Sequence, residues 1–148
     1  MLKLRPHHIL DIVRNIGNER PIFPHEYGHL LHVITEKLIS DINTKCMLVI
    51  ENDDICGPCK MLTSDQNCID LLRQIEQPVS KQKYNDDLDK RVIDFLNLRP
   101  NIVLTIREYL VLVKNNMNDL VDICTHPKED KENRKIGLIK GMIKLGIN

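Results

Sequence analysis

The feature that most constrains this chain is a short segment that carries three of its five cysteines. Cys56 and Cys59 lie in the sequence ICGPCKML, and Cys68 follows after eight residues rich in turn-forming side chains. The segment has little apolar periodicity, so core packing explains its thiols poorly, although free cysteine often packs as a small hydrophobe. Two cysteines separated by two residues can turn both thiolates towards one metal ion or cluster. The spacing therefore favours a metal site, with residues 51–68 as its loop.

A thiolate site of this kind needs a fourth ligand. Cys124 ends the apolar sequence DLVDIC and precedes the polar sequence THPKED, so it lies where a predicted element ends and a ligand is well placed. His126 is close enough in the sequence to take the same role. Cys46 lies inside the apolar run CMLVI, where core packing explains it. Sequence position therefore favours Cys124, with His126 and Cys46 as alternatives.

Apolar residues at helical spacing predict a mainly α-helical domain, with a short strand or hairpin beside the cysteine loop. The chain has 148 residues, which suits one domain, and we assign residues 1–148 to it. Thr105 and Glu108 form a capping box that marks the start of one helix. The predicted helices cover residues 7–17, 24–40, 69–76, 88–98, 105–117 and 128–146, and the predicted strand covers residues 46–50.

The predicted helix over residues 128–146 is amphipathic and rich in lysine. Its isoleucines, among them Ile136 and Ile143, fall near one face. Gly137 and Gly141 would allow close approach to another helix, because glycine has no side chain. We therefore expect a closing helix docked on the core, with a helix that binds a partner or a membrane surface as the alternative.

Charge and composition exclude several classes of partner. Lys plus Arg and Asp plus Glu number 21 each, so no net charge attracts nucleic acid or an anionic membrane. No apolar run approaches the roughly 20 residues that span a bilayer, and we expect no signal peptide. We expect a cytoplasmic protein with an unknown redox or protein partner, no nucleic acid and no membrane. Cytoplasmic thiols are kept reduced, so we do not expect the cysteines to form a disulfide framework.

Four stretches of the chain together resemble a known family: LRPHHIL, DDICGPC, LDKRVIDFLNLRPN and DLVDIC. They occur in order from Leu4 to about Cys124. They are similar to an uncharacterised family of small archaeal and bacterial proteins, which has an N-terminal RPHH motif and is suspected of binding an iron–sulfur cluster. The resemblance implies that Cys56, Cys59, Cys68 and Cys124 hold the cluster.

The resemblance also draws attention to Arg5, His7 and His8, which match the N-terminal motif. Histidines at a helix start can donate hydrogen bonds to a metal site or its sulfur atoms, and Arg5 would complement the negative charge of a thiolate cluster. Partly buried packing is the alternative for the histidines. The chain departs from the family where Asp11 replaces a frequent cysteine and where residues 125–134 contain no cysteine. A single set of four ligands is therefore the economical interpretation, with Asp11 as a candidate oxygen ligand or, more simply, a solvated carboxylate.

The metal and the chemistry stay open at this point. Zinc ribbons use two Cys-X-X-Cys pairs and this chain has one, which favours an iron–sulfur cluster over zinc. A second hypothesis is a thioredoxin-like thiol oxidoreductase, with Cys56 as nucleophile and Cys59 as the resolving thiol. The helix predicted after Pro100 does not fit a thioredoxin sheet, and Cys68 and Cys124 would have no role. A third hypothesis is a metal-free helical interaction module, so the sequence leaves enzymatic activity undecided.

The sequence HEYGH matches the zinc motif H-E-x-x-H of many metallopeptidases. On a helix, His25 and His29 would share one face, opposite the apolar stripe. His32 lies seven residues from His25, about 10.5 Å along a helix, which is too far for both to bind one ion. We therefore interpret these histidines and Glu36 as a solvated polar face and do not predict a metallopeptidase.

Overall fold

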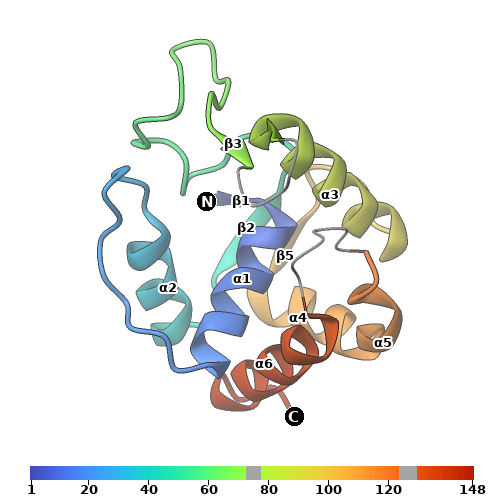
Figure 1. The fold of residues 1–148 in the computed structure, drawn as a ribbon. Coiled ribbons are helices and arrows are strands. Elements are labelled where there is room, and N and C mark those ends of the chain that lie inside the picture. The colour runs from blue at the N-terminus through green and yellow to red at the C-terminus, as the bar shows by residue number, and fades with distance from the viewer. Residues whose placement is uncertain (73–77, 124–129) are drawn as a thin grey trace.

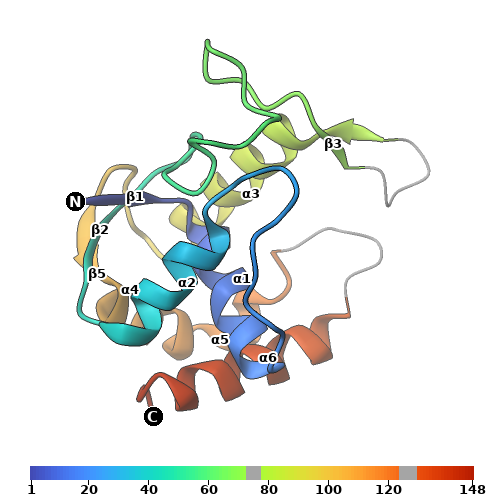
Figure 2. The ribbon, with the colours of Figure 1, turned by 90° about the vertical axis from the view of Figure 1, so that its left-hand side faces the viewer.

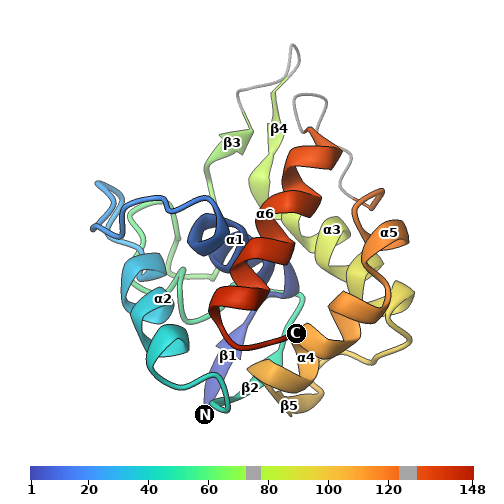
Figure 3. The same ribbon diagram turned by 90° about the horizontal axis from the view of Figure 1, so that it is seen from below.

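Helix α1 lies at the centre of the fold, with other helices on several sides of it (Figures 1 and 3). The computed structural model describes residues 1–72, 78–123 and 130–148. Helices form most of the regular structure, which confirms the mainly α-helical class. In chain order the elements are β1 (Leu2–Leu4), α1 (Pro6–Gly17), α2 (Leu31–Ser40), β2 (Lys45–Leu48), β3 (Leu71–Leu72), β4 (Val79–Ser80), α3 (Lys81–Phe95), β5 (Val103–Thr105), α4 (Ile106–Asn115), α5 (Met117–Leu120) and α6 (Lys131–Lys144).

A three-stranded sheet in the order β1-β2-β5 supports α1. Strand β1 runs parallel to β2, with Leu2 opposite Cys46, and β5 runs antiparallel to β2, with Leu104 opposite Cys46. The strand predicted at residues 46–50 forms as β2, which begins one residue earlier and ends at Leu48. Cys46 is fully buried at the centre of this sheet. The chain leaves β1 directly into α1, so the sheet fixes the start of the helix on which His7 and His8 lie.

Strand β3 replaces the first part of the helix predicted over residues 69–76, and residues 73–77 lie outside the described residues. Strand β3 pairs with β4 in an antiparallel hairpin. The hydrogen bonds of Asp70 explain why this segment begins as an extended strand rather than as a helix. Its carboxylate accepts hydrogen bonds from the Leu71 N–H at 2.9 Å and from Lys81 Nζ at 2.8 Å, and its carbonyl accepts from the Lys81 N–H at 3.1 Å. These contacts tie β3 to the first residue of α3.

The helix predicted over residues 24–40 forms only in its second half, as α2. Gly28 has a φ of +77°, in the left-handed region that favours glycine, and this conformation interrupts a right-handed helix. The Tyr27 N–H donates to His25 Nδ1 at 3.0 Å, so a local turn satisfies the backbone instead. The HEYGH sequence therefore lies in turns that lead into α2.

Glycines let α1 and α6 approach at very short range (Figure 3). A Cβ on Gly17 would lie 1.9 Å from the carbonyl oxygen of Gly137, and a Cβ on Gly141 would lie 2.0 Å from that of Val13. This confirms the expectation that Gly137 and Gly141 allow close approach to another helix. The glycine face of α6 is buried, and the isoleucine face, exemplified by Ile143, is exposed.

The helices of the described residues are short, and the longest is α3 with 15 residues. Within the described ranges, no helix is both long and apolar enough to cross a membrane.

Candidate metal site

The segment after β2 folds into a turn that Asp53 organises. Its Oδ1 accepts hydrogen bonds from the backbone N–H groups of Ile55 at 3.1 Å and Cys56 at 3.3 Å. Aspartate often caps a turn in this way, by accepting from N–H groups two or three residues further along the chain. The Asp53 carboxylate therefore fixes the backbone that presents Cys56. Figure 2 shows the cysteine loop at the N-terminal end of α1.

The second oxygen of Asp53 binds the start of α1. Its Oδ2 accepts from the Arg5 N–H at 2.7 Å and lies 2.8 Å from Nδ1 of His8. Burial alone would raise the pKa of the Asp53 carboxyl, but the charge and hydrogen bond of His8 and the Arg5 N–H outweigh it and lower this pKa to about 2. An ionised carboxylate only accepts hydrogen bonds, so Nδ1 of His8 carries the proton. When the ring is neutral, the lone pair of Nε2 is available to a ligand or metal ion.

His8, Asp53 and Cys56 form a compact group of metal-binding side chains. One ring nitrogen of His8, one carboxylate oxygen of Asp53 and Sγ of Cys56 lie within 4.8 Å of one another. Within the described ranges, no other group of three or more such side chains has this spacing. Each oxygen of Asp53 already accepts two hydrogen bonds. Asp53 therefore orients His8 and the Cys56 turn, and His8 and Cys56 are the side chains available to bind a metal ion.

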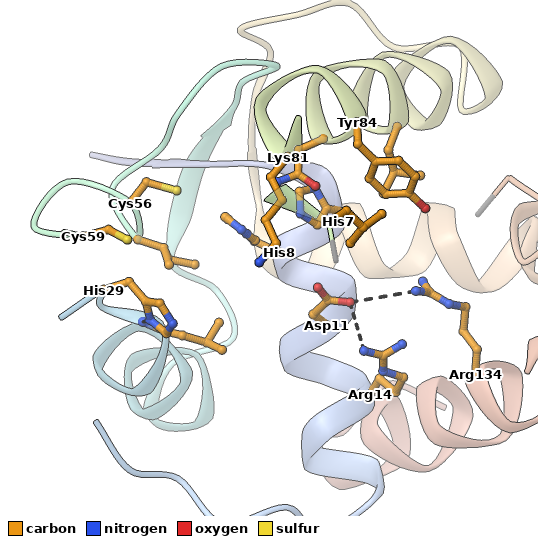
Figure 4. A pocket seen from close by; sticks show the side chains of 15 residues that line it. His7, His8, Asp11, Arg14, His29, Cys56, Cys59, Lys81, Tyr84 and Arg134 are labelled. Carbon is orange, nitrogen blue, oxygen red and sulfur yellow. Dashed lines mark hydrogen bonds and ion pairs between the residues drawn. The ribbon is translucent and has the colours of Figure 1, made fainter. Parts of the chain in front are cut away.

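Cys59 joins this group on the wall of one cavity. Its N–H donates to the Cys56 carbonyl at 2.9 Å, which closes a single turn between the two cysteines. Both sulfur atoms point to the same side, towards His8 and His29 (Figure 4). His29 lies across from them just before α2, and burial, followed by the charges of His25 and His8, lowers its pKa. The cavity has a volume of about 320 Å³ and is lined by all four of these side chains.

Burial also sets the protonation state of the first thiol. Together with the negative charge of Asp53, burial raises the pKa of the Cys56 thiol to about 12. A dithiol nucleophile requires the opposite shift, which a helix N-terminus or a nearby cation normally supplies. Cys56 and Cys59 lie in turns and no helix begins at them. The local geometry therefore differs from that of a thioredoxin active site.

A buried ionic network holds the other motif residues beside this site. Asp89 of α3 is fully buried and accepts hydrogen bonds from Arg5 Nη1 and His7 Nδ1, each at 2.8 Å. Arg5 also pairs with Asp86 at 2.7 Å. Burial opposes the charge on His7, but Asp89 outweighs this effect and raises the pKa of His7. The network locks α1 to α3, and His7 lines the same cavity as His8.

The structure divides the predicted site residues into three sets. Cys56 and Cys59 line the cavity, as do His7 and His8, whereas the guanidinium of Arg5 lies in the buried ionic network. Cys68 lies opposite Leu62 in a β-bridge and is not among the residues that line the cavity.

The fourth predicted ligand, Cys124, and the three alternatives Cys46, Asp11 and His126 have different positions. Cys46 is a core residue, and burial raises the pKa of its thiol to about 12. Asp11 lines the far side of the cavity and pairs with Arg14 at 3.3 Å. Cys124 and His126 lie outside the described residues, so their predicted roles remain predictions.

The HEYGH histidines have a structure that the helical interpretation missed. Nδ1 of His25 and Nδ1 of His29 each accept the N–H two residues further on, at 3.0 and 3.4 Å. Their rings stack at 4.6 Å between centroids. In the neutral ring this arrangement places the proton on Nε2, so both side chains present a donor rather than a metal ligand.

Asp53 is the site residue that sequence reasoning missed. It lies three residues before Cys56, the spacing at which an aspartate caps a turn, and this local signal was available in the sequence DDIC. Its long-range bond to His8 had no local signal, because 45 positions separate the two residues.

The fold and the site together define a mainly helical protein with several cysteines and a His–Asp–Cys group that can hold a metal ion. The chain belongs to a family described as protein of unknown function, DUF1284, whose model matches residues 23–128. The expected membership of an uncharacterised family is thereby confirmed. The matched range contains all five cysteines and begins after the Arg5–His8 motif. No curated protein and no solved structure gave a significant match.

Proposed function

We propose that this protein binds one transition-metal ion through His8, Cys56 and Cys59. The observation that carries the proposal is the compact group in which Asp53 binds His8 and one ring nitrogen of His8 lies within 4.8 Å of the Cys56 sulfur. Metal-binding histidines commonly donate their other ring N–H to a carboxylate, which fixes the tautomer and raises the basicity of the ligand. Asp53 has this relation to His8.

The ligand set favours zinc or ferrous iron. Imidazole and thiolate groups suit both metals, and two cysteines with one histidine form a known open zinc arrangement. Cys59 follows Cys56 by one turn and lines the same cavity, so we assign its sulfur to the same ion. Metal binding would displace the proton of Cys56, because thiolate is the form that binds. Three protein ligands leave a fourth coordination position that faces the cavity.

An iron–sulfur cluster held by Cys56, Cys59, Cys68 and Cys124 is the second candidate. The turn that places the first two cysteines on one cavity wall favours it, since this is the presentation that a cluster needs. The tight hairpin from Met61 to Ile69 returns Cys68 towards the same loop. This candidate requires the Cys68 sulfur to turn into the cavity, and the metal-ion candidate does not.

Metal analysis of protein purified without air tests both candidates. We expect about one metal ion per chain with no acid-labile sulfide, and we expect Cys56→Ser and His8→Asn to lose the metal. Cys46→Ala and His32→Asn are matched controls that should retain it, because Cys46 is a core residue and His32 lies outside this cavity. If the protein instead contains iron and acid-labile sulfide in equal amounts, and if Cys68→Ser also loses them, the iron–sulfur cluster is the correct candidate. Full metal content in Cys56→Ser would overturn both candidates.

A further inference from the structure

The outer face of α6 carries a stripe of apolar side chains that is left after the helix has docked. Ile136, Ile139 and Ile143 are 43%, 42% and 57% exposed, whereas Gly137 and Gly141 of the same helix are buried. A helix turns by about 100° per residue, so the isoleucines lie on the side of α6 away from the glycines that contact α1. Figure 3 shows α6 at the surface of the molecule, in front of α1. The stripe is therefore open to another molecule.

The spacing of the stripe is that of a coiled-coil seam. In a heptad lettered a to g, positions a and d face the partner helix, and Ile136, Ile139 and Ile143 take positions a, d and a. They span about 60° of the helix surface, which is narrower than the apolar face of roughly 100° or more with which a helix packs into a core. Helices that lie on a membrane carry Trp, Phe or Leu on that face, and these three side chains are all isoleucine. The stripe therefore fits one partner helix better than a membrane surface.

Lysines border the stripe on both sides. Lys135 takes position g and Lys140 takes position e, the positions that flank a coiled-coil seam. In the described part of the chain, no salt bridge joins either lysine to a carboxylate. Glu19 pairs with Lys144 at 2.9 Å, and its pKa is lowered by the hydrogen bond and charge of Lys144 before the smaller effect of Lys140. Both borders of the stripe are therefore positively charged.

These lysines disfavour a second copy of this chain as the partner. In a parallel pair, Lys135 of one copy would face Lys140 of the other, because position g pairs with position e of the following heptad. In an antiparallel pair, positions e face one another, so Lys140 of the two copies would meet. Like charges at these positions select against a pairing, and opposite charges select for one. The complementary helix therefore has acidic side chains where α6 has lysines.

We propose that the outer face of α6 binds an amphipathic helix of another protein. Apolar side chains of that helix pack against the isoleucine stripe, and its Asp or Glu side chains lie opposite Lys135 and Lys140. The inference goes beyond the proposed function and does not depend on it, because α6 supplies none of the proposed metal ligands.

Binding of a designed three-heptad peptide tests the proposal. The probe has leucine at positions a and d and glutamate at e and g, and its control has lysine at e and g. Glutamates at e and g repel one another and keep the probe monomeric. By fluorescence anisotropy, we expect the glutamate peptide to bind at least roughly threefold more tightly than the lysine peptide at low salt, with a smaller preference at high salt. No binding of the glutamate peptide up to about 1 mM, or equal affinity for both peptides at low salt, would overturn the proposal.

A double charge reversal makes the test specific. Lys135→Glu with Lys140→Glu should reverse the preference, so that the lysine peptide binds more tightly than the glutamate peptide. Lys37→Glu with Lys114→Glu is the matched control, because both are exposed lysines on other helices and the change in net charge is the same. A wild-type preference in the first double variant, or a reversed preference in the control, would overturn the proposal.

The isoleucine stripe is tested by a second pair of variants. Ile143→Gln should weaken binding of the glutamate peptide about fivefold or more, because burial of the exposed part of this side chain is lost. Val33→Gln is the matched control, since Val33 of α2 is 44% exposed. Both variants should keep the thermal denaturation midpoint of the wild type, because the side chains they replace are exposed. Unchanged affinity in Ile143→Gln would overturn the proposal.

Sedimentation and vesicle binding distinguish the other occupants of this face. A dimer of the wild type that dissociates in Ile143→Gln would assign the face to a second copy of the chain and overturn the proposal. Vesicles of phosphatidylserine and phosphatidylcholine should not compete with the glutamate peptide. Vesicle binding that is lost in Ile143→Gln would assign the face to a membrane and overturn the proposal as well.

Discussion

His8 Nδ1 lies 2.8 Å from Asp53 Oδ2, a contact that joins α1 to the cysteine loop across 45 positions of the sequence. Asp53 also accepts the N–H of Cys56, so one carboxylate positions the two candidate ligands at the same time. The relation explains why the RPHH motif and the CGPC loop form one site although they are distant in the chain.

Asp53→Asn should therefore weaken metal binding without removing a ligand. The amide cannot accept all four hydrogen bonds of the carboxylate, and loss of a carboxylate behind a metal-binding histidine typically lowers affinity about 10- to 100-fold. Competition with a chelator of known affinity measures the change. Asp54→Asn is the matched control, because Asp54 binds the Lys3 N–H outside the cavity. Equal loss in both variants would contradict the role assigned to Asp53.

Asp89→Asn should strongly destabilise the fold. The fully buried Asp89 carboxylate compensates Arg5 and His7, and its neutralisation leaves buried cationic charge without its main partner. Breaking a buried ion pair in this way costs roughly 3–5 kcal/mol in the free energy of unfolding. Urea denaturation measures it. Asp87→Asn on the same helix should change stability little, since Asp87 is exposed and pairs with Lys83 at the surface.

The stabilisation from Asp89 should depend on pH in a defined window. Burial opposes ionisation, but His7 and Arg5 outweigh it and lower the folded-state pKa of Asp89 below 3.8, so its contribution is present above that pH and lost as the pH falls. The folded-state pKa of His7 lies above 6.5, so its contribution is present below that pH and lost as the pH rises through the folded value. The difference in unfolding free energy between wild type and Asp89→Asn should be largest between about pH 4 and 6.5. A difference that is constant from pH 3 to 9 would contradict this coupling.

Gly141→Ala should separate α6 from α1. Its Cβ would lie 2.0 Å from the Val13 carbonyl oxygen, and backbone cannot move aside as a flexible side chain can. We expect a loss of roughly 1–3 kcal/mol in the free energy of unfolding, as for other overpacked sites. Thermal denaturation measures it. Gly57→Ala is the control, because the nearest atom to its Cβ would be at 3.6 Å, and it should be almost neutral.

Cys46→Ala should lower stability and leave metal content unchanged. Cys46 is fully buried in β2, so removal of its sulfur leaves a small cavity that costs about 1 kcal/mol. Metal analysis together with denaturation distinguishes it from Cys56→Ser, which should lose the metal. Loss of metal in Cys46→Ala would instead indicate that Cys46 is a metal ligand.

The sequence predicted the local features of this fold better than the contacts between them. Helix α1, strand β2 and the capping box of Thr105 and Glu108 follow from periodicity and spacing, and all three form. The helix predicted from residue 24 failed until α2 because a left-handed Gly28 and the histidine turns compete with it. The two glycines of α6 were identified from the sequence as a site of close approach, and they pack against α1, whereas Ile136 and Ile143 on another face are exposed.

Local patterns in the sequence also predicted part of the candidate site, but not the long-range contacts that complete it. Spacing identified Cys56 and Cys59, and the structure places both at one cavity. The partnership of His8 with Asp53 depends on how β1 and the cysteine loop meet in space, which no local pattern encodes. The contact of Arg134 with Asp11 likewise depends on the crossing of α1 and α6, which no local pattern encodes.

An ion held by His8 and Cys56 would turn the 47 residues between them into a closed ring that contains α2 and β2. A covalent or coordinate link of this length restricts the unfolded chain far more than the folded one, by about 4 kcal/mol in the loop-closure description of crosslinks. Removal of the ion would therefore lower the free energy of global unfolding without changing a contact of the sheet or of the glycines between α1 and α6. Hydrogen exchange of the slowest amides, which exchange only through global unfolding, would then act as a gauge of metal occupancy.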